Sequence, residues 1–137
     1  MKDKAFVDTN VLIYLYSQDE PEKKQVSHDI FNKFYCIISD QVINELSNVL
    51  IRKFQIKPLE VIKVIDEIIA NCEISLLYVD IIKKALNIVD KYGYSYFDSL
   101  IIAIAIESEC KLLLTEDMQD GQNIEKQLII TNIFKDI

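Results

Sequence analysis

The sequence is poor in the residues that mark disordered, fibrous, disulfide-linked and membrane-spanning proteins. Its 137 residues include only two glycines and two prolines, which excludes collagen-like and low-complexity chains. The three cysteines, Cys36, Cys72 and Cys110, are widely spaced and form no CxxC pair, so neither a disulfide framework nor a zinc site is expected. The longest apolar runs, Val11–Tyr16 and Leu100–Ile106, are much shorter than the roughly 18 residues of a transmembrane helix.

Positive charge is also scarce. Fifteen Lys and Arg face 22 Asp and Glu, which gives a net charge of −7, and Arg52 is the single arginine. This balance argues against a protein that binds nucleic acid through a broad basic surface. It leaves nucleic-acid chemistry open, because carboxylates that hold divalent cations present positive charge to a phosphate. The single histidine, His28, lies in the polar part of a predicted helix and is expected at the surface.

The length fits one domain spanning residues 1–137. The first residues, MKDKAFVDTN, contain no apolar segment followed by a small-residue cleavage site, which argues against export. The cytoplasm is therefore the expected location.

Short apolar segments alternate with segments of helical periodicity along the whole chain. The predicted strands are Ala5–Val7, Cys36–Ile38, Leu76–Val79, Leu112–Thr115 and Leu128–Thr131. The predicted helices cover about 22–35, about 40–54 after a cap at Ser39 or Asp40, a segment from Pro58, a segment from a cap at Asp80 to a stop at Gly93, and Tyr96–Glu109. This alternation predicts an α/β fold with a mostly parallel sheet, in which sites form at the carboxyl ends of strands.

Four carboxylates stand apart from the solvated faces of the helices. Asp8 follows the first predicted strand, Glu45 lies on an early turn of a helix, Asp98 opens the most apolar helix, and Asp117 follows Leu112–Thr115. Each one alone has a structural explanation as a turn or helix-start residue. If the termini converge, however, the four form an acidic pocket that repels itself unless cations bind, and hard oxygen ligands favour Mg²⁺ or Mn²⁺.

Four motifs carry a resemblance to a known family. They are FVDTNVLI at Phe6–Ile13, SDQVINEL at Ser39–Leu46, YFDSLIIAIA at Tyr96–Ala105 and LLTED at Leu113–Asp117. In this order and spacing they resemble the PIN domain, and in particular the small VapC-like toxin ribonucleases of type II toxin–antitoxin modules. The resemblance covers essentially the whole chain. It implies a PIN-like three-layer sandwich with a mostly parallel central sheet flanked by helices, and a Mg²⁺- or Mn²⁺-dependent endoribonuclease.

The resemblance also implies roles for individual residues. Asp8, Glu45, Asp98 and Asp117 match the metal-binding catalytic acids of the family, with Asp8 and Asp98 as the principal ligands. Thr9 matches a supporting hydroxyl that holds a carboxylate or a water by a hydrogen bond.

Two departures from the family pattern affect this assignment. Ser99 stands where relatives often have alanine after the third acid, which is a mild change. The run after Thr115 differs from the usual turn, so Glu116, Asp117 and Asp120 all compete as the fourth acid, and the register with Thr115 favours Asp117.

The sequence leaves several partners and functions open. The resemblance implies an RNA substrate, a homodimer, and a small antitoxin whose C-terminal segment covers the active site. The alternatives are a stand-alone PIN nuclease in RNA processing and a catalytically inactive PIN-like scaffold, although the presence of all four acids counts against the scaffold. A phosphatase of the haloacid-dehalogenase type would need an aspartate at Asn10, and no GxGxxG or P-loop indicates a nucleotide-binding enzyme.

The sequence gives weaker evidence for residues that contact the substrate than for the four acids. The basic groups Arg52, Lys53 and Lys57, and Lys83, Lys84 and Lys91, can meet phosphates or simply be solvated. Two tyrosines ahead of Asp98, Tyr94 and Tyr96, can stack on an unpaired base or pack at the rim of the core.

Overall fold

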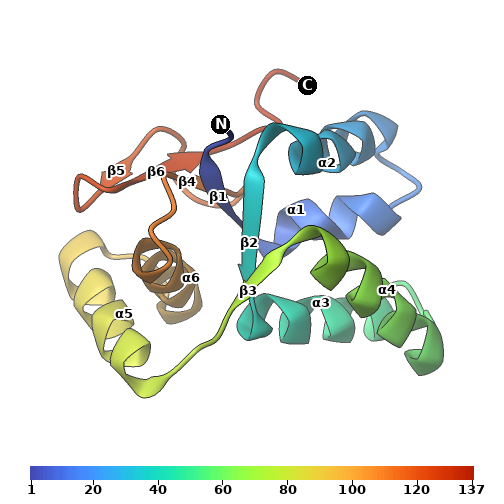
Figure 1. The fold of residues 1–137 in the computed structure, drawn as a ribbon, viewed down its shortest axis with the longest axis horizontal. Coiled ribbons are helices and arrows are strands. Elements are labelled where there is room, and N and C mark those ends of the chain that lie inside the picture. Colours follow the sequence, from blue (N-terminus) through green and yellow to red (C-terminus); the bar gives the residue numbers. More distant parts are fainter.

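The computed structural model describes all residues from 1 to 137 as a six-stranded sheet flanked by helices (Figure 1). The strands are β1 (Lys4–Val7), β2 (Tyr35–Ser39), β3 (Glu73–Ser75), β4 (Leu112–Leu114), β5 (Asn123–Ile124) and β6 (Leu128–Thr131). The helices are α1 (Thr9–Ile13), the 3-10 helix η1 (Tyr14–Tyr16), α2 (Pro21–Lys33), α3 (Asp40–Arg52), α4 (Pro58–Asn71), α5 (Val79–Tyr92) and α6 (Tyr96–Glu107).

The sheet has the strand order β3-β2-β1-β4-β6-β5, and every neighbouring pair is parallel except β5 and β6. Phe6 of β1 pairs with Ile37 of β2 on one side and Leu113 of β4 on the other. In Figure 1, α5 and α6 lie on one side of the sheet and α1 to α4 on the other, which makes three layers. The predicted α/β fold with a mostly parallel sheet is therefore confirmed.

The apolar segments form the core because they are covered on both faces. Ala5, Phe6 and Val7 of β1 are completely buried, as expected of a central parallel strand between two helical layers. In α6 all residues from Ser99 to Ala105 are buried, which confirms the prediction of a buried central helix. The opening turn of α6 and the carboxyl end of β1 thus directly adjoin the buried core.

Local capping residues set the helix ends largely as predicted. Ser39, rather than Asp40, caps α3, and its Oγ accepts a hydrogen bond from the backbone N–H of Val42 at 3.2 Å. Gly93 ends α5 in the left-handed conformation, with φ of 76°, and its N–H donates to the carbonyl of Val89.

The third strand and the start of α5 were misplaced by the sequence pattern. The strand predicted at Leu76–Val79 lies at Glu73–Ser75, because these residues pair with Ile37–Ser39 of β2. Leu76 is 63% exposed, so its apolar side chain does not mark a buried strand. α5 begins at Val79 without a side-chain cap, and Asp80 lies in its first turn rather than capping it.

The cysteines, the single histidine and the helix lengths can also be compared with the expectations from the sequence. Cys36 and Cys110 are buried, Cys72 is half-buried, and all three thiols are free. His28 is exposed, as predicted. No helix has the length and apolar character needed to cross a membrane.

Candidate active site

Asp8 occupies the junction between β1 and α1. It caps α1, and its Oδ1 accepts a hydrogen bond from the backbone N–H of Thr9 at 2.7 Å. Its Oδ2 accepts from Thr115 Oγ1 at 2.9 Å and from Asn10 Nδ2 at 3.3 Å. The residue is only 7% exposed, so three donors hold a nearly buried carboxylate in one orientation.

The surroundings of Asp8 disfavour its negative charge. Burial raises the pKa of Asp8 to about 6, against the lowering effect of the hydrogen bonds from Thr115 and Thr9. The carboxylates of Glu45 and Asp98 raise it further, and no cation acts on it. A bound cation would relieve both effects, since it would supply the missing countercharge.

Glu45 comes from the second turn of α3 and is exposed. Its Oε2 accepts a hydrogen bond of 2.6 Å from Thr9 Oγ1. The first residue of α1 therefore aligns a carboxylate of α3 beside Asp8.

Asp98 lies in the first turn of α6, where Ser95 Oγ accepts a hydrogen bond from its backbone N–H at 3.2 Å. Its carboxylate is half-buried. Burial raises the pKa of Asp98, and the nearby charges of Asp117 and Glu45 raise it further. Asp98 is thus within electrostatic range of carboxylates from α3 and from the end of β4.

Asn10 connects the two strand ends. Its Nδ2 donates to Asp117 Oδ2 at 3.0 Å and to Thr115 Oγ1 at 3.0 Å, and its Oδ1 accepts from the N–H of Glu116 at 3.2 Å. The sequence pattern alone assigns no role in the site to Asn10 or Thr115. The available signal was their position next to predicted acids on β1 and β4, but their mutual contact depends on the pairing of those strands.

The structure separates the three competitors for the fourth acid. Glu116 accepts hydrogen bonds of 2.6 Å from both Lys23 Nζ and Tyr14 Oη. Partial burial acts to raise the pKa of Glu116, but these two donors outweigh it and hold the pKa below its usual value. Glu116 already has a countercharge, so it is not a free carboxylate facing the other acids.

Asp120 is also engaged elsewhere. Its Oδ1 accepts from the N–H of Asn132 at 2.7 Å, and Lys135 lies 3.5 Å from its Oδ2. The backbone hydrogen bond from Asn132 is the main cause that lowers the pKa of Asp120. Asp117 is the one of the three whose carboxylate accepts a hydrogen bond from Asn10 and acts on Asp98.

The four predicted acids, Asp8, Glu45, Asp98 and Asp117, therefore form what we call the acidic cluster. The cluster is open: no three Asp, Glu, His or Cys side chains lie close enough together to enclose a metal ion. None of the four carboxylates takes part in a salt bridge. Such a donor set fits a hydrated Mg²⁺ ion, which is usually bound by one or two carboxylates and keeps several waters.

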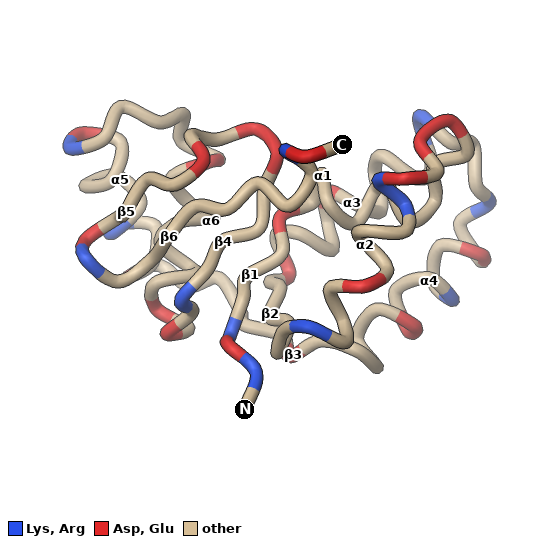
Figure 2. Tube along the Cα trace, turned by 90° about the horizontal axis from the view of Figure 1, so that it is seen from above, with Lys and Arg blue, Asp and Glu red and all other residues tan.

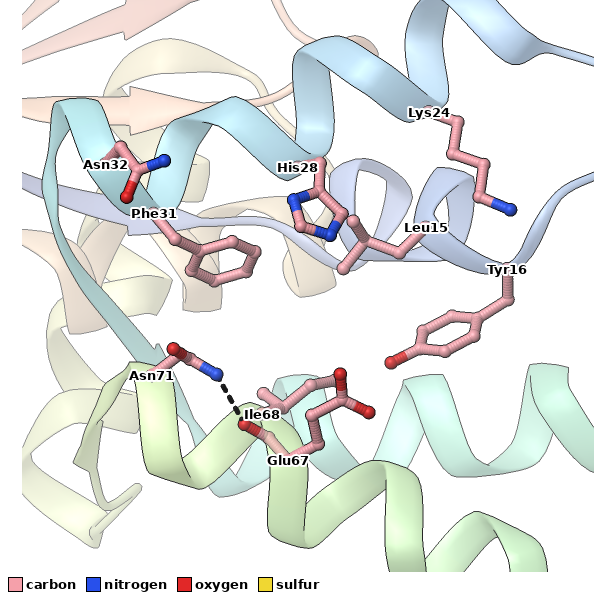
Figure 3. A pocket seen from close by; sticks show the side chains of 9 residues that line it. All are labelled: Leu15, Tyr16, Lys24, His28, Phe31, Asn32, Glu67, Ile68 and Asn71. Atoms are coloured by element: carbon pink, nitrogen blue, oxygen red, sulfur yellow. Dashed lines mark hydrogen bonds between the residues drawn. The ribbon is translucent and has the colours of Figure 1, made fainter.

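A separate cavity of ≈ 330 Å³ lies between α2 and α4 and includes none of the acidic cluster. It is lined by Leu15, Tyr16, Lys24, His28, Phe31, Asn32, Glu67, Ile68 and Asn71 (Figure 3). Lysine and arginine residues are spread around the outside of the molecule in Figure 2 and do not gather on one face. The acidic cluster is accordingly the feature with the most specific chemistry.

Comparison with known proteins places this geometry in context. The family model described as PIN domain matches residues 5–119. A toxin–antitoxin complex from Klebsiella pneumoniae contains a chain that is 19% identical, with a TM-score of 0.71, over 95% of this chain and 98% of that chain. VapBC from Salmonella typhimurium gives 17% identity and a TM-score of 0.70 over 96% and 98% of the two chains.

A further similar structure is VapC20 of Mycobacterium tuberculosis, a toxin that cleaves the sarcin–ricin loop. It is 14% identical with a TM-score of 0.64, over 80% of this chain and 86% of that chain. At these identities the structures establish a shared fold. A search of curated proteins gave no significant match.

Proposed function

This chain belongs to the PIN domain family and has the fold of its VapC-like members, and from this premise we propose that it is a metal-dependent endoribonuclease. One observation carries the proposal. The nearly buried Asp8 carboxylate, whose pKa is raised to about 6, faces other carboxylates and no basic side chain. A protein maintains such unbalanced charge at a cost in stability, which a functional cation would explain.

The roles follow from position and burial. Asp8 and Asp98 are the principal ligands for Mg²⁺ or Mn²⁺, because they are the most enclosed of the four acids. Glu45 and Asp117 are exposed and bind the ion directly or through water. Thr9, the residue after Asp8, holds the Glu45 carboxylate through its hydrogen bond of 2.6 Å.

A divalent ion held by these carboxylates would supply a water of lowered pKa and positive charge opposite the phosphate. The protein's own contribution is orientation. Backbone and side-chain donors from Thr9, Asn10 and Thr115 fix the Asp8 carboxylate before any ion or substrate arrives. The reaction needs no histidine base, which agrees with the exposed position of His28 outside the cluster.

We further propose that the protein is the cytoplasmic toxin of a type II toxin–antitoxin module and acts as a homodimer. The similar structures from Klebsiella pneumoniae and Salmonella typhimurium are described as toxin–antitoxin and VapBC complexes, which supports a small antitoxin as partner. The net charge of −7 suits a basic partner segment, since opposite charges assist recognition.

The test is cleavage of total cellular RNA by the purified protein in EDTA, Mg²⁺ or Mn²⁺. We expect cleavage only with metal, and its loss in Asp8→Asn and Asp98→Asn. Asp80→Asn is the matched control, because Asp80 occupies the first turn of α5 as Asp98 does in α6, outside the acidic cluster.

Binding of Mn²⁺, measured by calorimetry on the same proteins, separates the alternatives. Cleavage at the wild-type rate by Asp8→Asn, or cleavage in EDTA, contradicts the proposal. A folded wild-type protein that neither binds Mn²⁺ nor cuts RNA supports the inactive scaffold instead.

A further inference from the structure

The first turn of α6 carries two exposed aromatic side chains directly before Asp98. Phe97 is 61% exposed and Tyr96 is 37% exposed. Their ring centroids are 5.3 Å apart with an interplanar angle of 65°, an edge-on contact in which each ring limits the motion of the other. The exposed parts of these two rings do not pack in the hydrophobic core, so core packing does not explain them.

The other aromatic residues around the acidic cluster have structural partners. The hydroxyl of Tyr94 hydrogen-bonds to Gln122 and accepts from the N–H of Gln119 at 3.3 Å. The Tyr14 hydroxyl is bound to Glu116. Of the two tyrosines that the sequence singled out, Tyr94 is therefore committed to the fold, whereas Tyr96 and its neighbour Phe97 are free at the surface.

The acidic cluster has little positive charge beside it to attract an RNA phosphate, and the two rings offer another kind of contact. The charges that shift the pKa of Asp8 and Asp98 all belong to carboxylates. On α5, Lys84 is paired with Glu107, and Lys91 lies 2.8 Å from Glu125, so each of these lysines already has an anionic partner. Stacking of a base on an aromatic ring would add affinity that does not depend on lysine–phosphate pairs.

We propose that Phe97, supported by Tyr96, is a stacking platform for an unpaired base of the RNA strand whose phosphate lies at the acidic cluster. This inference rests on the proposed function and assigns a substrate-binding residue to it. A base within a duplex already stacks on its neighbours, whereas an unpaired base can lie on an aromatic ring. Every base has such a face, so Phe97 selects unpaired structure rather than sequence.

The experiment measures binding without requiring cleavage. A fluorescein-labelled oligoadenylate of about 12 nucleotides, single-stranded or annealed to oligouridylate, is titrated with the full-length protein in Ca²⁺ and followed by anisotropy. We expect Phe97→Ala to weaken single-strand binding by roughly fivefold or more, and Phe97→Trp to retain it, because stacking on an aromatic ring is lost only in the first. Duplex binding should be weak and unchanged in both variants.

Leu59→Ala is the matched control, since Leu59 is the second residue of α4 as Phe97 is of α6, and is 74% exposed. In steady-state cleavage, Phe97→Ala should raise KM with little change in kcat, because the ring binds substrate but does not touch the reacting atoms. Circular dichroism of each variant verifies folding, which an exposed side chain should not affect.

Each outcome separates this inference from the proposed function. RNA cleavage by the wild type, with single-strand binding unaltered in Phe97→Ala, overturns the platform and leaves the ribonuclease standing. Binding through Phe97 without metal-dependent cleavage retains the platform and overturns the ribonuclease. A change in sedimentation coefficient without a change in RNA binding overturns the platform and assigns the ring to a contact between copies.

Discussion

The side-chain amide of Asn10 lies 3.0 Å from Oδ2 of Asp117 and thereby joins the end of β1 to the loop after β4. The same nitrogen is 3.0 Å from Thr115 Oγ1 and 3.3 Å from Asp8 Oδ2. One neutral donor thus contacts two carboxylates, and it sets their orientation without neutralising them.

Removal of the Asn10 side-chain amide should lower metal affinity and cleavage activity without unfolding the protein. We expect Asn10→Ala to lower the cleavage rate by roughly tenfold and to raise the Mg²⁺ concentration for half-maximal activity, because residues that orient metal ligands have effects of this size. Activity measured across a Mg²⁺ series tests this, with Asn48→Ala, at an exposed position of α3, as control. Equal rates for both variants throughout the series would show that the amide has no positioning role.

Asp117 and Asp120, which both follow β4, should respond differently to loss of charge. Asp117→Asn should reduce metal-dependent cleavage by at least roughly tenfold, because Asp117 contacts Asn10 and acts on Asp98. Asp120→Asn should leave the rate within about twofold of wild type, since Asp120 binds the backbone of Asn132 instead. A larger loss of kcat in Asp120→Asn than in Asp117→Asn would reverse the assignment.

The stability of the metal-free protein should depend on pH through Asp8. Its pKa rises from 3.8 unfolded to about 6 folded, so the native state binds the proton more tightly. Stability from this group is therefore greatest below pH 4 and falls as the pH rises through about 6, and the full shift corresponds to about 3 kcal/mol.

Urea denaturation in EDTA at pH 5 and 7.5 measures this effect. Between these two values Asp8 should reduce the unfolding free energy by about 1 kcal/mol, and Asp8→Asn should remove that part of the difference. Mg²⁺ should stabilise the wild type at pH 7.5 but not the variant. A variant with an unaltered pH dependence would mean that Asp8 is not the group responsible.

The Lys23–Glu116 ion pair should contribute measurably to stability. Its side chains are 23% and 24% exposed and are joined at 2.6 Å, with Tyr14 as a second donor to Glu116. A double-mutant cycle of Lys23→Met and Glu116→Gln should give a coupling energy of about 1 kcal/mol in urea denaturation, at the upper end for partly exposed pairs. A coupling energy indistinguishable from zero would mean that the Lys23–Glu116 pair does not contribute to stability.

Gly93→Ala should destabilise the end of α5 through the backbone alone. Gly93 has φ of +76°, and an added Cβ would meet no atom within 4 Å. The expected loss is about 1 kcal/mol, since an L-residue is strained in this region. Thermal unfolding measures this loss. Ala70→Gly, at an exposed position of α4, is the comparison for ordinary helix propensity. An unchanged midpoint in Gly93→Ala would show that the left-handed turn has no energetic weight.

Much of the fold was predictable because the governing signals are local. β6 lies at Leu128–Thr131 as predicted, and α6 begins at Tyr96, since apolar periodicity and a Ser95 cap act within a few residues. β3 was misplaced because an apolar run at residues 76–79 looks like a strand until its pairing with β2 is known. The short strand β5 carries no distinctive pattern and exists through its pairing with β6.

The sequence alone determined the order of the elements, the family resemblance and the four acids at the ends of apolar segments. Tertiary structure decided how the carboxylates are held and which of the neighbouring acids joins them. Lys23 and Glu116 are 93 positions apart, and Asn10 and Asp117 are 107 apart. No local pattern encodes such contacts. The Asn10–Asp117 contact arises when β1 and β4 pair side by side and bring the polar residues at their carboxyl ends together, and the Lys23–Glu116 contact also requires α2 to pack beside them.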